Sequence, residues 1–267
     1  MDLMYSISGF AVGVLVGITG VGGGSLMTPL LVFMFGFQPA VAVGTDLLYA
    51  AITKTGGVVV HHGKHQSVDW RVVGLLALGS LPMAIATLLT IRYLMSVGTE
   101  VTGAISWSLG LALILTSSAL LIRAVLLRGR VNANDHEASM KSAARFQHGG
   151  EIPVTILIGA VLGILVTLSS VGAGALGTVA LLFLYPRSST LKIVGTDLAH
   201  AIPLTAIAGM GHWLLGNVNF VLLGSLLIGS LPGIWVGSHL SAKIPEQWLR
   251  PFLAVILMII GLKFVLS

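Results

Sequence analysis

The chain of 267 residues contains no cysteine, which excludes disulfides, thiolate metal sites and cysteine redox relays. Charge is scarce as well: Asp, Glu, Lys and Arg together make up 9% of the residues, against about 25% in an average soluble domain. The opening Met-Asp-Leu-Met lacks the basic region of a signal peptide, and we expect none. The chain is 55% hydrophobic, and apolar blocks of about 20 residues recur from end to end. It is therefore predicted to be an all-α, polytopic protein of the lipid bilayer.

The net charge of +5 does not indicate a nucleic-acid partner. The basic residues stand mostly in short loops between apolar blocks, where they determine membrane topology. One longer hydrophilic stretch, residues 128–151, predicts a cytoplasmic linker. It separates two membrane-embedded parts, residues 1–127 and 152–267, which together form one transport domain.

Glycine interrupts the first apolar stretch, which runs from about Tyr5 to Phe35. The run Gly20-Val21-Gly22-Gly23-Gly24-Ser25 places four glycines in six positions, and each costs a helix about 1 kcal/mol relative to alanine. Two half-helices meeting at an unwound turn are the expected result. A similar interruption, Ser169-Ser170-Val171-Gly172-Ala173-Gly174, follows about 150 residues later. Irregular backbone at membrane depth is tolerated only where it is buried in protein or lines a cavity.

Three further anchors recur in the same order, again about 150 residues apart. They are Val43-Gly44-Thr45-Asp46 with Val194-Gly195-Thr196-Asp197, Ser67-Val68-Asp69-Trp70 with Asn217-Val218-Asn219-Phe220, and Gly79-Ser80-Leu81-Pro82 with Gly229-Ser230-Leu231-Pro232. The sequence predicts two internal repeats, each with a glycine-broken helical hairpin and three transmembrane helices. Such breaks at matching positions of two halves are typical of a transporter's binding site.

The orientation of the repeats depends on whether the broken segments cross the membrane. Each half-helix has about 14 residues, or roughly 21 Å, which is shorter than a hydrocarbon core of roughly 30 Å. If both hairpins are re-entrant, every loop lysine and arginine except Arg92 and Lys263 faces the cytoplasm, a split of 11 to 2. If both cross, the split is 8 to 5. Because cytoplasmic loops are enriched in Lys and Arg, we favour inverted repeats; full crossings are the alternative.

These motifs resemble the TauE/SafE sulfite exporter family. The matching features are Gly17-x-x-Gly20-Val-Gly-Gly-Gly-Ser25 with Pro29, Val43-Gly44-Thr45-Asp46, the His-rich loop ending in Val68-Asp69-Trp70, and Gly79-Ser80-x-Pro82. The resemblance covers about residues 5–265. It implies export or permeation of a small sulfur-containing anion, such as sulfite or an organosulfonate, across the bacterial inner membrane. The second glycine run departs from the family pattern.

The glycine turns are the first candidate site. A half-helix begins with unpaired N–H groups and a positive partial charge, which suit an anion, and Ser25 is placed to cap its helix or reach a ligand. Close packing of helices is the alternative role of the glycines. The predicted substrate-binding residues are Gly22, Gly23, Gly24, Ser25, Thr45, Ser170, Gly172, Gly174 and Thr196.

Two carboxylates, Asp46 and Asp197, fall inside apolar helices. A carboxylate at mid-membrane costs roughly 2.5–3.5 kcal/mol, so it normally faces a partner or a cavity. We predict that both carry a coupling proton, with Thr45 and Thr196 donating to the substrate. The alternatives are a structural brace through backbone N–H groups, or a pair between Asp46 and Lys54, which would otherwise snorkel or attract the anion.

Histidine, which titrates near neutrality, supplies further candidates for proton coupling. His61 and His212 occupy equivalent positions, and Asp197-x-x-His200 places a carboxylate and an imidazole on one helix face. The predicted proton-coupling residues are Asp46, Asp197, His61, His200 and His212. The alternative is that such histidines are merely wetted at helix ends.

The leading hypothesis is a secondary transporter that works by alternating access. The sequence predicts neither an enzyme nor a cofactor, and it leaves open whether the chain forms a homodimer. A divalent-metal permease using His61, His62, His65 and Asp69 is an alternative, because imidazole suits nickel, cobalt or zinc. An intramembrane serine hydrolase using Ser25 is another, although no base or oxyanion site accompanies it. A passive channel would show no dependence on a proton gradient.

Overall fold

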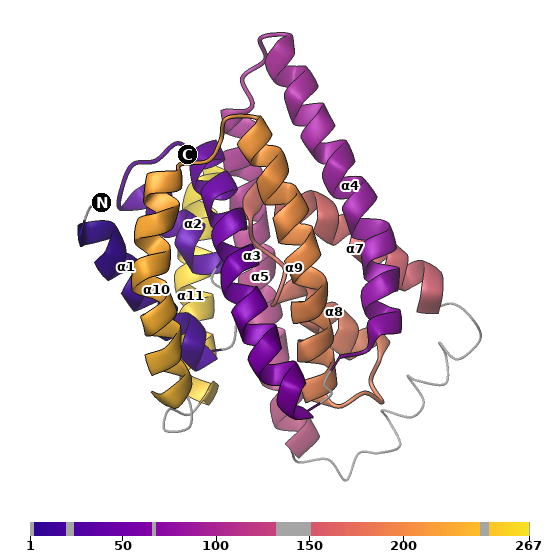
Figure 1. Cartoon of the computed structure of the whole chain (residues 1–267). Helices are drawn as coiled ribbons and strands as arrows, with labels where there is room; N and C mark the ends of the chain where they lie inside the picture. The colour runs from indigo at the N-terminus through magenta and orange to yellow at the C-terminus, as the bar shows by residue number, and fades with distance from the viewer. Residues whose placement is uncertain (1–2, 20–23, 66–67, 132–150, 241–245, 267) are drawn as a thin grey trace.

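The computed structural model describes residues 3–19, 24–65, 68–131, 151–240 and 246–266. In these ranges it consists of ten α-helices, without strands (Figure 1). The helices are α1 (Leu3–Thr19), α2 (Gly24–Phe33), α3 (Pro39–His65), α4 (Trp70–Ser96), α5 (Thr102–Val131), α7 (Glu151–Ser169), α8 (Leu176–Leu184), α9 (Thr190–Leu214), α10 (Phe220–Leu240) and α11 (Glu246–Leu266).

Five helical segments in the described ranges are long and apolar enough to cross a membrane: α4, residues 102–122 of α5, α7, α9 and α10. The prediction of an all-helical, multi-pass membrane protein is confirmed. Two predicted boundaries shift. The polar loop expected to begin at His61 is shorter, because α3 continues to His65, and α5 extends into the predicted linker as far as Val131. Polar residues at a helix end that leaves the apolar layer can keep their helical hydrogen bonds in water.

Helix α1 packs on α10 through interlocking glycines. A Cβ on Gly9, Gly13 or Gly17 would overlap backbone atoms of α10, and one on Gly229, Gly233 or Gly237 would overlap backbone atoms of α1. Small residues every fourth position let helix backbones approach closely in a membrane. The contacts advance in the same direction along both helices, so α1 and α10 run parallel.

Helices α4 and α7 pack in the same way. Gly159 lies against the backbone of Leu76, Gly163 against that of Ser80, and Gly79 against that of Ile156. These pairs also advance together, so α4 and α7 run parallel. Helix α7 is thus held by a helix from the first half of the chain, just as α1 is held by one from the second half.

At the centre of the bundle, α3 lies beside α9 (Figure 1). Gly44 lies against Asn217, and Gly209 against Leu48, so these two helices are antiparallel. Each begins at the end of the bundle where the other ends. Buried apolar side chains between them, including Val43, Leu47 and Leu204, form one cluster of the core.

The short helices α2 and α8 turn back, so each broken segment is a hairpin. Helix α10 follows α9 after a short turn and therefore runs with α3, and so does α1, its parallel partner. Helix α2 is joined to α3 by residues 34–38 and folds back on it, so it runs against α1. The same reasoning applies to α7, α8 and α9. Because α3 and α9 begin at opposite ends, the two hairpins enter the bundle from opposite ends.

Candidate functional site

The second hairpin turn, residues 170–175, is an unwound, buried segment between α7 and α8. Gly172 and Gly174 both have φ 119°, a value that glycine adopts without steric cost. Ser170 has φ 60°, in the left-handed region that residues other than glycine adopt less often. Ser169 holds the start of the turn: its hydroxyl donates to the Leu165 carbonyl and accepts from the Val171 amide at 3.1 Å. The predicted interruption of the helix is confirmed.

The first turn is described only at its far end. Gly22 and Gly23 lie outside the described residues. Gly24 is the first residue of α2, and Ser25, the second, is 6% exposed. The predicted role of these residues in substrate binding therefore stays a prediction.

Each buried aspartate accepts a hydrogen bond from a threonine on the returning arm of its hairpin. Thr28 Oγ1 on α2 donates to Asp46 Oδ2 at 2.5 Å, and Thr178 Oγ1 on α8 donates to Asp197 Oδ2 at 2.8 Å. Both carboxylates are fully buried. The two threonines were missed in the sequence, although their separation of 150 residues matches that of the other repeated anchors.

The threonines that precede the aspartates brace the starts of two long helices. Thr45 Oγ1 accepts from the Asn219 amide at 3.1 Å, just before α10. Thr196 Oγ1 accepts from the Asp69 amide at 2.9 Å, just before α4, and donates to the Lys192 carbonyl. Both contacts join elements from different halves of the chain. Donation to a substrate, as predicted from the sequence, would require these hydroxyls to change partners.

Lys54 projects from the middle of α3 to the second hairpin turn and is 5% exposed. Its Nζ donates to the Ala173 carbonyl at 3.2 Å. Asp197 and Asp46 are the acidic groups that attract the ammonium. A direct pair between Asp46 and Lys54, one of the alternatives raised by the sequence, is not among the contacts of the described residues. Eight residues of helix separate the two backbones by roughly 12 Å.

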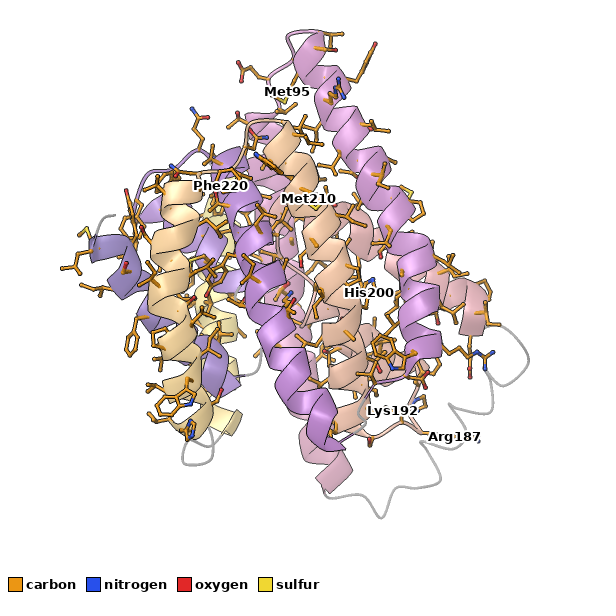
Figure 2. All side chains as sticks on the ribbon, viewed as in Figure 1. Met95, Arg187, Lys192, His200, Met210 and Phe220 are labelled. Carbon is orange, nitrogen blue, oxygen red and sulfur yellow. The ribbon has the colours of Figure 1, made fainter. Side chains whose placement is uncertain are left out.

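Two histidines are fixed inside the bundle. His200 projects from α9 towards α4 (Figure 2), where Nε2 lies 2.8 Å from Ser80 Oγ. His212 Nε2 lies 2.9 Å from the Thr167 carbonyl on α7, so it is a buried side chain that joins two helices and not a wetted helix end. The side chains of His61, His62 and His65 lie outside the described part of the chain, and the predicted metal cluster is untested.

Tyr49 stands in α3 where His200 stands in α9. It faces Ser230 on α10, as His200 faces Ser80, although the two hydroxyls do not meet hydrogen-bonding geometry. One half of the site therefore carries a phenol where the other carries an imidazole.

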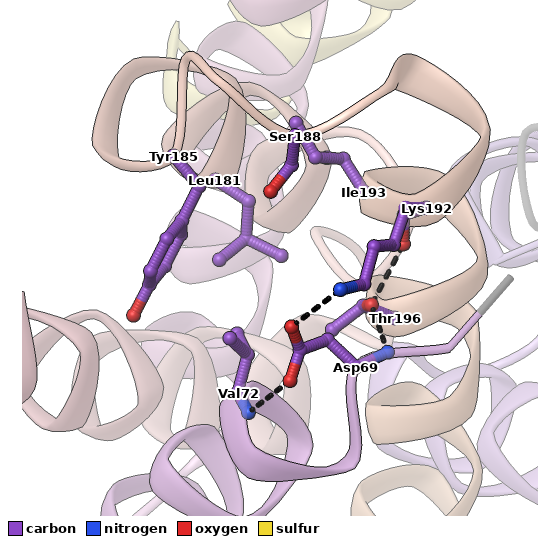
Figure 3. A pocket seen from close by; sticks show the side chains of 8 residues that line it. All are labelled: Asp69, Val72, Leu181, Tyr185, Ser188, Lys192, Ile193 and Thr196. Carbon is purple, nitrogen blue, oxygen red and sulfur yellow. Dashed lines mark hydrogen bonds and ion pairs between the residues drawn. The ribbon is translucent and has the colours of Figure 1, made fainter. Parts of the chain in front are cut away.

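A pocket lies at the end of the bundle where α9 begins, and an ion pair crosses it (Figure 3). Lys192 Nζ lies 2.9 Å from Asp69 Oδ2. The lining residues are Asp69, Val72, Leu181, Tyr185, Ser188, Lys192, Ile193 and Thr196. At the opposite end of the bundle, Asn219 stands at the position that corresponds to Asp69. That position therefore carries a neutral amide in place of a carboxylate.

The ion pair makes the stability of this end depend on pH. The hydrogen bond from Lys192 is the main cause that holds the pKa of Asp69 below its usual value. With a depressed pKa in the folded state, the stabilisation is present above the unfolded pKa and is lost as pH falls through the folded pKa. Because both side chains are partly exposed, we expect a coupling of about 0.2–1 kcal/mol.

Asp69→Asn tests this prediction. Asn still caps α4 by accepting from the Val72 amide, as an N-cap should, so the variant removes only the charge. Thermal unfolding of the detergent-solubilised chain should depend less on acid pH in Asp69→Asn and in Lys192→Gln, and the double variant should lose little more than either. Identical pH profiles in the parent and Asp69→Asn would contradict the prediction.

In this bundle of membrane-spanning helices, two hairpins enter from opposite ends and bury a lysine between two carboxylates. This arrangement is typical of membrane transporters with discontinuous helices. The sequence model of a protein family, described as "Sulfite exporter TauE/SafE", matches residues 5–264. The chain belongs to that family. The family consists of transporters and not enzymes, which rules out the hydrolase alternative at Ser25.

Curated relatives support the same assignment. The chain is 36% identical to the probable membrane transporter protein YjnA of Bacillus subtilis over 265 residues, 99% of this chain and all of the relative. It is 25% identical to the probable membrane transporter protein YdhB of the same organism over 217 residues, 80% of each chain. No solved structure matches the chain significantly.

Proposed function

We propose that the chain is a secondary transporter that moves a small sulfur-containing anion, of the sulfite or organosulfonate class, across the bacterial inner membrane. The observation that carries the proposal is the buried centre. Two hairpins from opposite ends bring hydroxyls, two carboxylates and one ammonium together between α3 and α9. The family description supports an anion of this class.

Alternating access about two inverted repeats is the proposed mechanism. Matched contacts support it: Thr28–Asp46 corresponds to Thr178–Asp197, and Asn219–Thr45 to Asp69–Thr196. The glycine contacts of α1 with α10 also recur, shifted by 150 positions, in those of α7 with α4. A pseudo-twofold relation between the halves would let one conformation open to each side of the membrane.

The proposed substrate site consists of the two hairpin turns with Thr45 and Thr196. Asp46 and Asp197 carry the coupling proton. His200 and His212 lie on α9, the helix that also carries Asp197. The unwound backbone of the second hairpin turn, residues 170–175, fits an oxyanion, since backbone N–H groups are oriented donors.

Reconstitution of the full chain into proteoliposomes tests the proposal. We expect saturable uptake of radiolabelled sulfite or of a labelled sulfonate, stimulated by an imposed pH gradient and abolished by a protonophore. Protein-free liposomes are the control. Absence of flux of either anion would overturn the proposal, and flux of nickel or cobalt in its place would favour the histidine-loop alternative. Gradient-independent, non-saturable flux would favour a channel.

A further inference from the structure

Lys54 is a buried cation whose donors are not all used. An ammonium offers three hydrogen bonds, and within the described residues Lys54 makes one, to the Ala173 carbonyl. Two other buried polar atoms, Asp46 Oδ1 and Ser170 Oγ, also have no hydrogen-bond partner in the described part of the chain. Asp46 is one of the acidic groups that attract Lys54, and Ser170 lies in the same turn as Ala173. Asp46 on α3 and Ser170 at the start of the second hairpin turn lie near each other, but these two atoms do not meet hydrogen-bonding geometry. Buried polar groups are normally satisfied, so a set of this kind points to a ligand that completes it.

The charges around Lys54 do not balance for an incoming anion. The titratable groups that face Lys54 and Asp46 are Asp46 and Tyr49 on α3, and Asp197 and His200 on α9. The other packed elements bring none close: α2 and α8 carry no titratable side chain, α7 carries only Glu151 at its start, and α5 and α10 carry theirs near their ends. With both carboxylates ionised the centre holds two negative charges and one positive charge.

An anion added to this centre would leave a larger uncompensated negative charge in a low-dielectric interior, which is strongly unfavourable. Protonation of Asp46 cancels one negative charge, so the centre with a bound monoanion keeps the single net negative charge that it has when empty. It also turns Oδ1 from an acceptor, which repels an oxyanion, into an O–H donor. The same proton therefore offsets the charge of the anion and supplies a hydrogen bond to the substrate.

We infer that Lys54 is the counter-charge of the transported anion, which it binds together with Ser170 and protonated Asp46, so that the anion cannot bind without taking up a proton. This inference rests on the proposed function and specifies it. Anion and proton travel in the same direction, and the number of protons follows the charge of the anion.

Calorimetric titration of the purified full chain tests the coupling without a mutation. Sodium ethanesulfonate, a monoanion, and sodium thiosulfate, a dianion, are titrated at neutral pH in phosphate and in Tris, whose ionisation enthalpies differ. Neither anion titrates in this range, so the difference between buffers counts protons taken up by the protein. We expect about one proton per ethanesulfonate and more per thiosulfate.

Variants then test Lys54 itself. Lys54→Gln is expected to weaken anion binding roughly tenfold to a hundredfold, and Lys54→Arg to keep most of it. Because Lys54→Gln alone leaves two carboxylates without a cation, the Lys54→Gln/Asp46→Asn double variant keeps the charge balance; it should fold and still fail to bind. Lys263→Gln, which removes a lysine that lies over Phe33, is the matched control and should bind normally.

The outcomes separate the inference from the proposed function. Anion binding without proton uptake in the parent, or normal binding by the double variant, would overturn the inference and leave the transporter proposal intact. Absence of binding of both anions at every pH, together with absence of flux in proteoliposomes, would overturn the transporter proposal and the inference with it.

Discussion

Asp46→Asn should fold like the parent chain and lose the stimulation of transport by a pH gradient. Asn keeps an oxygen that accepts from Thr28, so the contact between α2 and α3 survives, but it cannot carry a proton. If proton and anion binding are coupled, the gradient-driven flux should fall by roughly 5–150-fold, the range typical of coupling between two binding events. The measurement is initial uptake of labelled anion into proteoliposomes with and without an imposed gradient.

Two further variants distinguish coupling from a structural brace. Thr28→Val removes the same hydrogen bond but leaves the carboxylate, so it should lower thermal stability while preserving the response to the gradient. Asp69→Asn removes an acid outside the centre and should leave the response unchanged. If Asp46→Asn keeps its response and merely melts earlier, as Thr28→Val does, then Asp46 is a brace.

Gly79→Ala is expected to have a large effect on folding. A Cβ at this position would overlap the carbonyl oxygen of Ile156 and lie 2.7 Å from the Ala160 amide nitrogen. These are backbone atoms of α7, which cannot rotate away, so the helices must separate along their whole contact. We expect a loss of at least about 3 kcal/mol of stability, at the upper end of overpacking effects.

The matched control lies in the same helix. A Cβ on Gly74 would meet nothing within 4 Å, and alanine there should stabilise α4 by up to about 1 kcal/mol. Thermal unfolding in detergent and the yield of monodisperse protein are the measurements. Equal melting temperatures for the two variants would mean that the close approach of α4 and α7 does not hold in the folded protein.

The sequence predicted what depends on local patterns. The long apolar blocks indicated membrane helices, and Gly172 and Gly174 indicated the break before α8 because glycine at that density disfavours a helix. The spacing of Thr45-Asp46 and Thr196-Asp197 also placed two acids in equivalent positions. Thr28 and Thr178 carried the same signal and were missed because a threonine in an apolar helix has an ordinary structural use, bonding to its own backbone.

The rest depends on which helices become neighbours. The contacts of Asp69 with Thr196 and of Lys54 with Ala173 join residues more than 100 positions apart, and no local pattern specifies such a pair. A direct pair between Lys54 and Asp46, one of the alternatives that the sequence left open, relied on proximity along one helix and is not among the described hydrogen bonds and ion pairs. The ammonium instead reaches a turn from the other half, which only the packing of α3 against α7, α8 and α9 determines.

The exchange of glycine-lined partners between the halves has a consequence for synthesis. Helix α1 leaves the ribosome before its partner α10, which follows roughly 220 residues later. At a usual rate of about 5–20 residues per second, α1 waits on the order of 10–40 s with its glycine face unoccupied. During that interval the membrane holds an incomplete first hairpin. The buried centre therefore cannot close until the last quarter of the chain has been made, and a chain that stops after α9 contains every residue of the centre but cannot assemble it.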